Sequence, residues 1–437
     1  MLTTLGRPRW KTDLADTSAA VVLSEGNSLG FLFLATAFLI GCGFGTISSS
    51  PVAAPGLQLA GKVHGGQQPV SGATIQLYAA GVNGYGTGAA PLLSTPVTTD
   101  SAGSFNITEN YVCPSSSSLV YIVATGGNPG VGTGSNSAIA LAAALGTCSF
   151  GGTTPTLDPT QFININEVTT VAAVYSLAQF WGANTLSVGT SATNVTGLTN
   201  AFAIAATLAN SANGTAYAAT PSGGMTVPQA EIYTLANIVA SCVNTAGPSA
   251  VAGDPCTTLF SSVQAQNATA PTNTIATLLD IALSPSANVA ALYVLVGAKA
   301  PFQPGLTSVP ADFSVALSGT LSNVDAIYGI AIDSSGNAWT GGGTGVPNNN
   351  MTGSLLEFFP EGALVSGAAG FTGGGVAAPL QIAIDPMDNV WAVDGNLDNV
   401  TEFNNSGAAL TATPIALNSP APLISDLKIS GAGRYGL

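Results

Sequence analysis

Two stretches in the last third of the chain repeat one pattern, and this repeat constrains the fold more than any other feature. They are IYGIAIDSSGNAWTGGG at 327–343 and PLQIAIDPMDNVWAVDG at 379–395, in a register of 52 residues. A similar strand pair follows each copy, and a third copy begins at ISDLKISGAGRYG. Periods of about 40 to 50 residues with short strands and Gly or Asp turns indicate propeller blades or solenoid units. The segment 312–437 is therefore predicted to consist of two to three small repeated sheets.

The conserved spacing inside the repeat favours structural roles for its polar and aromatic residues. Isoleucines at alternate positions are expected to face the neighbouring repeat. Asp333 and Asp385 are expected to cap hairpin turns, and Trp339 and Trp391 to fill the space between sheets. The alternative is that these four residues contact a ligand at the face of the ring. Neither turn carries the ligand set of an EF-hand calcium loop.

The motif I-A-I-D-x-x-G-N-x-W resembles NHL-type and virginiamycin B lyase-like β-propellers. This resemblance implies a propeller-type surface that takes a protein or a glycan as ligand. The lyases use histidine and a divalent metal, but 313–437 contains no histidine, so their activity is not carried over. A closed ring needs four or more blades. We therefore expect either a truncated form of a longer reading frame or several chains that complete one ring.

The stretch FLFLATAFLIGCGFG at 31–45 is the longest apolar run near the start of the chain. Even 30–45 is shorter than the roughly 20 residues needed to cross a bilayer. Basic residues precede the run, as in an export signal, namely Arg7, Arg9 and Lys11. The alternative to an export signal is a short buried helix with an ordinary core cysteine.

Leu39-Ile40-Gly41-Cys42 resembles the lipobox of bacterial lipoproteins. The resemblance implies that 1–42 is a signal peptide, that the Cys42 sulfur is diacylated, and that the membrane is reached through this lipid anchor. Gly43 follows, with no aspartate there to retain the protein at the inner membrane. We expect a flexible linker at 43–56 and a bacterial cell-envelope location, at the outer membrane or the cell surface.

Export would place the other four cysteines in an oxidising compartment, where they should form disulfides. Four cysteines allow three connectivities. Proximity in the chain favours Cys113–Cys148 and Cys242–Cys256. A zinc site is the alternative, but the chain has no CxxC motif and His64 is its only histidine.

Residues 57–150 are predicted to form an N-terminal β-sandwich. Apolar and polar residues alternate on both sides of a Gly-Gly-Gln-Gln-Pro turn, which is the pattern of half-buried strands. Gly61 and Val63, the segment Pro69 to Ala73, and the hairpin Thr99 to Phe105 resemble the carboxypeptidase regulatory-like family. That resemblance implies a prealbumin-like sandwich without catalytic residues.

Residues 160–305 are rich in Ala and Leu at helical spacing and predict a central α-helical domain of four or five helices. Asn166 is the expected cap of the first helix, and Pro228 suits a first helical turn. The expected role is that of a spacer or a packing platform. The whole chain is thus predicted to be multidomain α+β, with a sandwich, a helical domain and an incomplete propeller.

Composition limits the function. Only 6% of residues are charged and the net charge is −14, whereas phosphate-backbone binding needs clustered cations, so nucleic acid is excluded. So few titrating groups also predict a stability that changes little with pH. There is no G-x-S-x-G elbow, His64 is expected to be a solvated residue beside a turn, and no catalytic residue, metal or cofactor is predicted. We expect a non-catalytic envelope lipoprotein; the alternative is an exported lyase or hydrolase whose catalytic blades are missing.

Overall fold

A computed structural model describes ten stretches of the chain. They are 59–130, 134–263, 269–297, 300–321, 326–344, 352–377, 379–394, 399–417, 428–429 and 435–436. The expected signal peptide, the linker and Cys42 lie outside these residues. The described part is a mixed α+β structure, and none of its helices is long and apolar enough to span a membrane.

The first sheet is built around β1, Leu59–Gly65, whose side chains alternate between buried and half-buried as the sequence pattern predicts. Its other strands are β2 (Gln68–Pro69), β6 (Ser104–Ile107) and β9 (Phe162–Ile165). β2 and β6 pair with β1 antiparallel, whereas β9 pairs with it in parallel. A Cβ on Gly61 would lie 2.2 Å from the Ile163 carbonyl oxygen, so only glycine fits between the flanking strands.

The second sheet has the strand order β4-β3-β7-β8, with β5 also paired to β3. Its strands are β3 (Thr74–Ala79), β4 (Ala90–Pro91), β5 (Val97–Thr98), β7 (Leu119–Thr125) and β8 (Ala140–Thr147). The disulfide Cys113–Cys148 joins the chain before β7 to the residue after β8. The sequence favoured this pairing because the two cysteines are close together in the chain.

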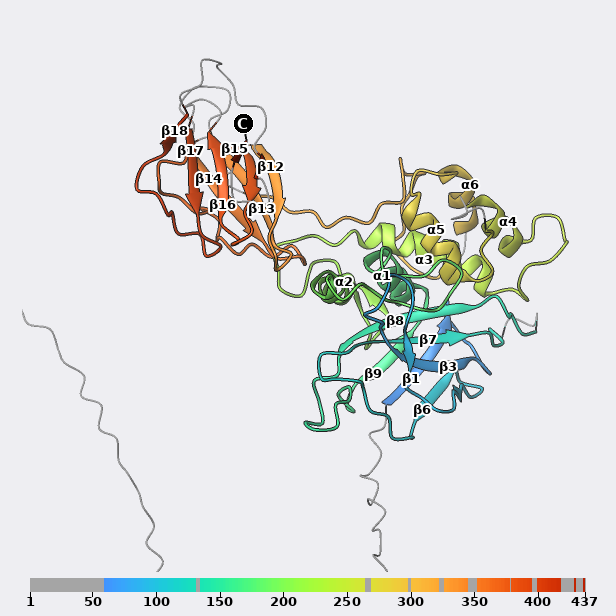
Figure 1. The fold of residues 1–437 in the computed structure, drawn as a ribbon. Coiled ribbons are helices and arrows are strands. Elements are labelled where there is room, and N and C mark those ends of the chain that lie inside the picture. The colour runs from blue at the N-terminus through green and yellow to red at the C-terminus, as the bar shows by residue number, and fades with distance from the viewer. Residues whose placement is uncertain are drawn as a thin grey trace, which may run out of the picture. The chain divides into compact units, whose positions relative to one another are not determined.

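Six α-helices lie between residues 167 and 293 of the described chain. They are α1 (Glu167–Ser176), α2 (Val195–Leu208), α3 (Gln229–Val243), α4 (Pro255–Ser262), α5 (Thr274–Leu283) and α6 (Val289–Tyr293). The short helix η2 (Val294–Val296) follows, and the hairpin β10–β11 (Ala209–Asn210 and Thr215–Ala216) separates α2 from α3. α1 and α2 lie along β8 (Figure 1).

The helix ends follow the expected signals. The Asn166 side chain accepts the Thr169 backbone N–H, which confirms it as the cap of α1. Pro228 precedes the first residue of α3. The disulfide Cys242–Cys256 joins the end of α3 to the start of α4. This pairing was the one that proximity in the chain favoured. A loop of this length contributes about 3 kcal/mol by restricting the unfolded chain.

One hydrophobic core runs through both sheets and the helices, which differs from the expected division at residues 150–160. Ile75 and Tyr121 of the second sheet, Val168 of α1 and Leu235 of α3 belong to the same buried cluster. β9 falls inside the range expected to be helical, yet it extends the first sheet. The helices are therefore not a separate spacer, because their apolar faces complete the core of the sheets.

The C-terminal repeats form two antiparallel sheets. The first repeat sheet contains β12 (Ala326–Ile332), β13 (Ala338–Thr344) and β14 (Thr352–Phe358). The second contains β15 (Pro379–Ile384), β16 (Val390–Asp394), β17 (Asn399–Phe403) and β18 (Ile415–Ala416). A further pair, β19 (Lys428–Ile429) and β20 (Tyr435–Gly436), lies where the third copy was expected.

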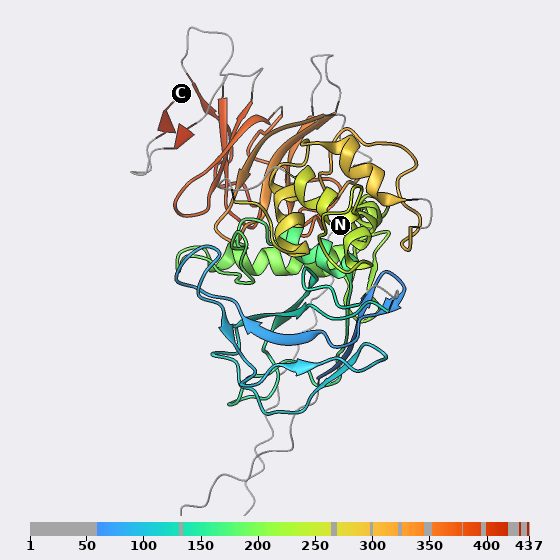
Figure 2. The same cartoon turned by 90° about the vertical axis from the view of Figure 1, so that its right-hand side faces the viewer.

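The two repeat sheets pack face to face, as the two views together show (Figures 1 and 2). Trp339 and Leu355 of the first sheet share a buried cluster with Ile382 and Phe403 of the second. A Cβ on Gly341 would lie 2.0 Å from the Pro379 carbonyl oxygen. Glycine at this position therefore lets the two backbones approach closely.

Candidate functional site

The aspartate of the first repeat is engaged in holding its own hairpin. One carboxylate oxygen of Asp333 accepts the backbone N–H groups of Ser335 and Asn337, at 2.9 and 2.8 Å. The other accepts the indole N–H of Trp339 at 3.1 Å. The Asn337 side chain in turn donates to Glu357 at 2.8 Å.

The second repeat reproduces this arrangement. Asp385 accepts the backbone N–H groups of Met387 and Asn389, and it also accepts the indole N–H of Trp391 at 3.2 Å. Burial by itself raises the pKa of Asp385, but these hydrogen bonds outweigh it and lower the pKa overall. Because the same carboxylate contacts recur in both copies, the motif acts as a turn cap combined with a tryptophan anchor.

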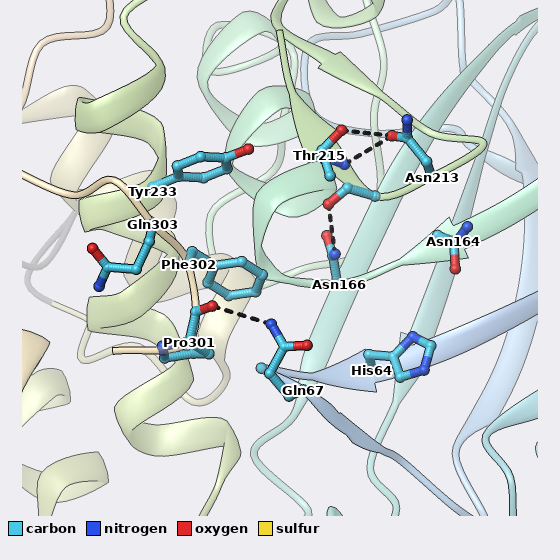
Figure 3. A pocket seen from close by; sticks show the side chains of 12 residues that line it. His64, Gln67, Asn164, Asn166, Asn213, Thr215, Tyr233, Pro301, Phe302 and Gln303 are labelled. Atoms are coloured by element: carbon cyan, nitrogen blue, oxygen red, sulfur yellow. Dashed lines mark hydrogen bonds between the residues drawn. The ribbon is translucent and has the colours of Figure 1, made fainter. Parts of the chain in front are cut away.

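No group of three or more His, Cys, Asp or Glu side chains in the described ranges is close enough together to hold a metal ion. A polar cavity is instead found at the end of β1. It has a volume of about 340 Å³ and lies among segments from five parts of the chain (Figure 3). It is lined by His64, Gly66, Gln67, Asn164, Asn166, Asn213, Gly214, Thr215, Tyr233, Pro301, Phe302 and Gln303.

The turn between β1 and β2 forms one wall of the cavity. Gly65 pairs with Gln68, which leaves a two-residue loop, and Gly66 has a φ of +61°. Glycine suits this first loop position because a side chain is strained at positive φ. At the tip, the Gln67 side chain donates to the Pro301 carbonyl at 3.1 Å and so links the turn to the opposite wall (Figure 3).

A buried carboxyl group holds this turn in place. The Gly66 backbone N–H donates to both oxygens of Glu167, at 2.9 and 3.0 Å, and the Glu167 side chain has no exposed surface. Glu167 is the first residue of α1, next to the Asn166 cap. The first turn of α1 and the tip of the β1 hairpin are therefore joined directly.

Burial raises the pKa of Glu167 to about 8, although hydrogen bonds from the Gly66 and Glu167 backbone N–H groups lower it in part. The carboxyl group is thus mostly protonated at neutral pH, and the region behind the cavity wall is uncharged. The expectation of a nearly pH-independent stability did not allow for this group. A chain with few titrating groups can still contain one group with a large pKa shift, and that single group makes stability depend on pH.

Two asparagines of the β9–α1 junction hold a second wall. The Asn164 backbone N–H and side chain donate to the carbonyls of Ser211 and Ala212. The Asn166 side chain donates to the Gly214 carbonyl at 2.8 Å while its oxygen caps α1. The β10–β11 hairpin is thereby fixed over the start of α1.

An aromatic pair forms the third wall. The rings of Tyr233, in α3, and Phe302 stack with their centres 6.2 Å apart. The buried Asn237 side chain accepts the Phe302 backbone N–H and donates to its carbonyl, each at 2.9 Å. This two-way contact positions the segment that carries Pro301, Phe302 and Gln303.

His64 was expected to be solvated beside a turn, and it does lie beside the β1–β2 turn, where it is half-buried and lines the cavity. Burial, followed by the charge of Lys62, lowers its pKa. The imidazole is therefore neutral at neutral pH, with one nitrogen that donates and one that accepts a hydrogen bond.

The lining is rich in groups that both donate and accept hydrogen bonds and carries no formal charge at neutral pH. Each side-chain amide has two donor hydrogens and two acceptor lone pairs. Internal bonds use one donor hydrogen of Gln67 and one of Asn164, and both an amide hydrogen and the oxygen of Asn166, and they leave the remaining positions for a ligand. Amides of this kind, beside stacked aromatic rings, suit an uncharged ligand with many hydroxyl groups better than an ionic one.

Sequence reasoning identified Asn166 as a helix cap but did not identify the cavity. Its lining residues are spread from 64 to 303 in the chain, so no local spacing brings them together. Glu167 was the one detectable signal, because it is an isolated acid within an apolar strand-to-helix stretch of a chain with 6% charged residues.

Comparison with known proteins returned no match: no family model, no curated protein and no solved structure is significantly similar to the chain.

Proposed function

We propose that this protein is a non-catalytic binding protein of the bacterial cell envelope, and that it holds an uncharged, hydroxyl-rich ligand of the saccharide class in the amide-lined cavity. The observation that carries the proposal is the lining itself, where amide, hydroxyl and imidazole groups lie beside the stacked Tyr233 and Phe302, each of which is 7% exposed. Sugars present hydroxyl groups on their edges and C–H groups on their faces. Amides complement the former and aromatic rings the latter.

Non-catalytic binding is favoured over hydrolysis by the residues around the cavity. Glycoside hydrolysis uses two carboxyl groups about 5 to 9.5 Å apart that flank the scissile bond. The lining side chains include no carboxylate, and Glu167 lies behind them with both of its oxygens on the Gly66 N–H. A protonated, fully covered acid is a poor nucleophile or base.

The fold assignments that accompany this proposal are a prealbumin-like sandwich for the two N-terminal sheets and propeller-type blades for the repeats. Their support is the alternating pattern around Gly61 and the recurring Asp–Trp contacts of Asp333 and Asp385. In this proposal the repeats are a second interaction surface and the cavity is the ligand site.

Binding to the cavity is tested by calorimetry with the full chain and a panel of neutral disaccharides, namely cellobiose, maltose and chitobiose, with glucuronate as a charged counterpart. We expect saturable binding of at least one neutral sugar. Gln67→Ala should weaken that binding about 5-fold, since a hydrogen bond contributes about 1 kcal/mol. Gln68→Ala is the matched control, because Gln68 is exposed in the same turn but does not line the cavity.

Three results would contradict the proposal. They are no binding of any neutral sugar, equal weakening by the two glutamine variants, and tighter binding of glucuronate than of every neutral sugar. Cleavage of a bound disaccharide, followed by the release of reducing ends, would show that the site is catalytic.

The envelope location rests on the lipobox-like sequence that ends at Cys42, and it has its own test. Cells that express the full chain should incorporate labelled palmitate into the protein and retain it in the membrane fraction. Cys42→Ser should abolish both, whereas Cys113→Ser, which changes a cysteine of the predicted exported part, should leave labelling intact. Membrane release of the wild-type chain without detergent would disprove the anchor.

A further inference from the structure

A second cavity, here called the apolar cavity, lies beside the first repeat sheet and has a volume of about 320 Å³. Its other lining residues are small, apart from Thr320, and no charged side chain contacts it. It differs in this respect from the amide-lined cavity at the end of β1. The large side chains that line it are Met225, Leu321, Ile327, Phe358 and Leu364.

One wall of the apolar cavity is a turn that two glycines accommodate. The Met225 side chain lies between Gly319 and Gly362. A Cβ on Gly319 would lie 2.5 Å from its sulfur, and one on Gly362 would lie 2.8 Å from its Cγ. Thr226 and Ser318 exchange two backbone hydrogen bonds, at 2.6 and 3.1 Å, which join this turn to the segment that carries Leu321. Backbone contacts therefore hold Met225 in the wall.

Another wall belongs to the first repeat sheet. Ile327 pairs with Gly342, which in turn pairs with Ser354. Ser354 lies four residues before Phe358 on the same face of β14. At about 3.3 Å per residue, Ile327 and Phe358 are separated by about 13 Å along the strands. A cavity that contacts both side chains is therefore long, and it suits a chain better than a compact ring.

The large side chains of the apolar cavity are not used in the cores of the protein. None of the five belongs to a hydrophobic cluster of the described residues, and Ile327 is 56% exposed. Exposed apolar residues that are scattered singly are normal, whereas several that line one cavity are typical of a binding site. A ligand in this cavity would remove their apolar surface from water.

We propose that the apolar cavity binds one unbranched hydrocarbon chain that carries an uncharged head group. An apolar cavity of about 150 Å³ holds one benzene molecule. A volume of about 320 Å³ therefore suits one short chain and not the two long chains of a membrane lipid. An anionic head group is disfavoured because the lining contains no cation and the net charge is −14. This inference does not depend on the proposed saccharide site.

The test is displacement of N-phenyl-1-naphthylamine, an uncharged dye that fluoresces in apolar surroundings. The full chain carries Cys42→Ser, so that no attached lipid competes for the cavity. We expect 1-alkanols to displace the dye, with an affinity that increases about fourfold for each added methylene until the chain fills the cavity. Decanoate should displace the dye less well than 1-decanol does.

Two matched pairs of variants separate the cavity from other apolar surfaces. Ala368→Trp places a large ring in the cavity and should weaken 1-decanol binding about 10-fold or more. Ala369→Trp is its control, because Ala369 is equally exposed but does not line the cavity. Met225→Gln keeps the length of the side chain but adds an amide, and it should weaken binding about 10-fold. Met387→Gln is its control, because Met387 is 78% exposed and lies elsewhere.

The proposal would be overturned if no dye were displaced, or if the two variants of either pair had equal effects. Stronger binding by Ala368→Trp would show that the alkanols adsorb to exposed apolar surface instead. Decanoate that binds as tightly as 1-decanol would contradict the uncharged head group. An affinity that does not increase with chain length would contradict the assignment of a chain.

Discussion

Replacing Glu167 with glutamine is expected to remove most of the pH dependence of the free energy of unfolding. Burial raises the pKa of Glu167 to about 8 in the folded chain, against the ordinary value of 4.5. The folded chain holds this proton more tightly than the unfolded chain, so unfolding releases it between these two pH values. Stability is therefore greatest below pH 4.5 and falls until the pH passes about 8.

The total fall corresponds to up to about 5 kcal/mol, because one pKa unit is worth about 1.4 kcal/mol. The glutamine amide cannot ionise and keeps an oxygen for the Gly66 N–H. We therefore expect the Glu167→Gln midpoint to change much less with pH than that of the wild type, with Glu231 supplying the remaining change, and to exceed the wild-type midpoint at pH 9. The measurement is urea unfolding followed by helical circular dichroism from pH 5 to 9.

Glu231 is a suitable second variant in this experiment. Burial first, and the nearby Asp312 charge second, raise its pKa to about 7. Glu231 is half-buried, so Glu231→Gln should reduce the change of the urea midpoint with pH less than Glu167→Gln does. A wild-type midpoint that does not change between pH 5 and 9 would show that Glu167 is ionised in the folded chain.

Replacing Trp339 with alanine is expected to destabilise the packed repeat sheets by about 4 kcal/mol, since removing a buried tryptophan leaves a large cavity. Trp339 is fully buried, it packs between the two sheets and stacks on Phe371, and its indole N–H donates to Asp333. Trp339→Phe keeps most of the apolar surface and loses the donor, so its cost should be about 1 to 2 kcal/mol.

Hydrogen exchange monitored by mass spectrometry can locate this effect. The backbone amides of β13 and β16, whose residues form the interface between the two repeat sheets, should lose protection against exchange. The amides of β7, in the N-terminal core, should keep theirs. Met387→Ala serves as the control, because this side chain is largely exposed. If Trp339→Ala left β16 protected, the tryptophan would not be the anchor of the two sheets.

Local patterns predicted the elements whose stabilising contacts are close in sequence. The Asn166 cap, the helix that starts after Pro228 and the turns at Asp333 and Asp385 all depend on atoms within six residues of each other. The two disulfides were also anticipated, because each joins cysteines that are near neighbours along the chain.

Local preference is overridden where distant segments decide the outcome. The run Ala140–Thr147, inside the range predicted to be a β-sandwich, is rich in alanine, which favours helices, yet it forms β8 because β7 supplies its hydrogen-bond partners. The short run at Phe162–Ile165 lies at the start of the range expected to be helical, but it pairs with β1, about a hundred residues earlier. In both cases the neighbouring strand outweighs local preference.

The sequence by itself determined the repeat, the cysteine pairs and the low charge of this protein, because these depend on spacing and composition along one chain. Only the tertiary structure decided that the helices share the core of the sheets and that Glu167 is buried against Gly66. Burial removes water from a particular group, and which groups lose water depends on contacts between segments far apart in the chain.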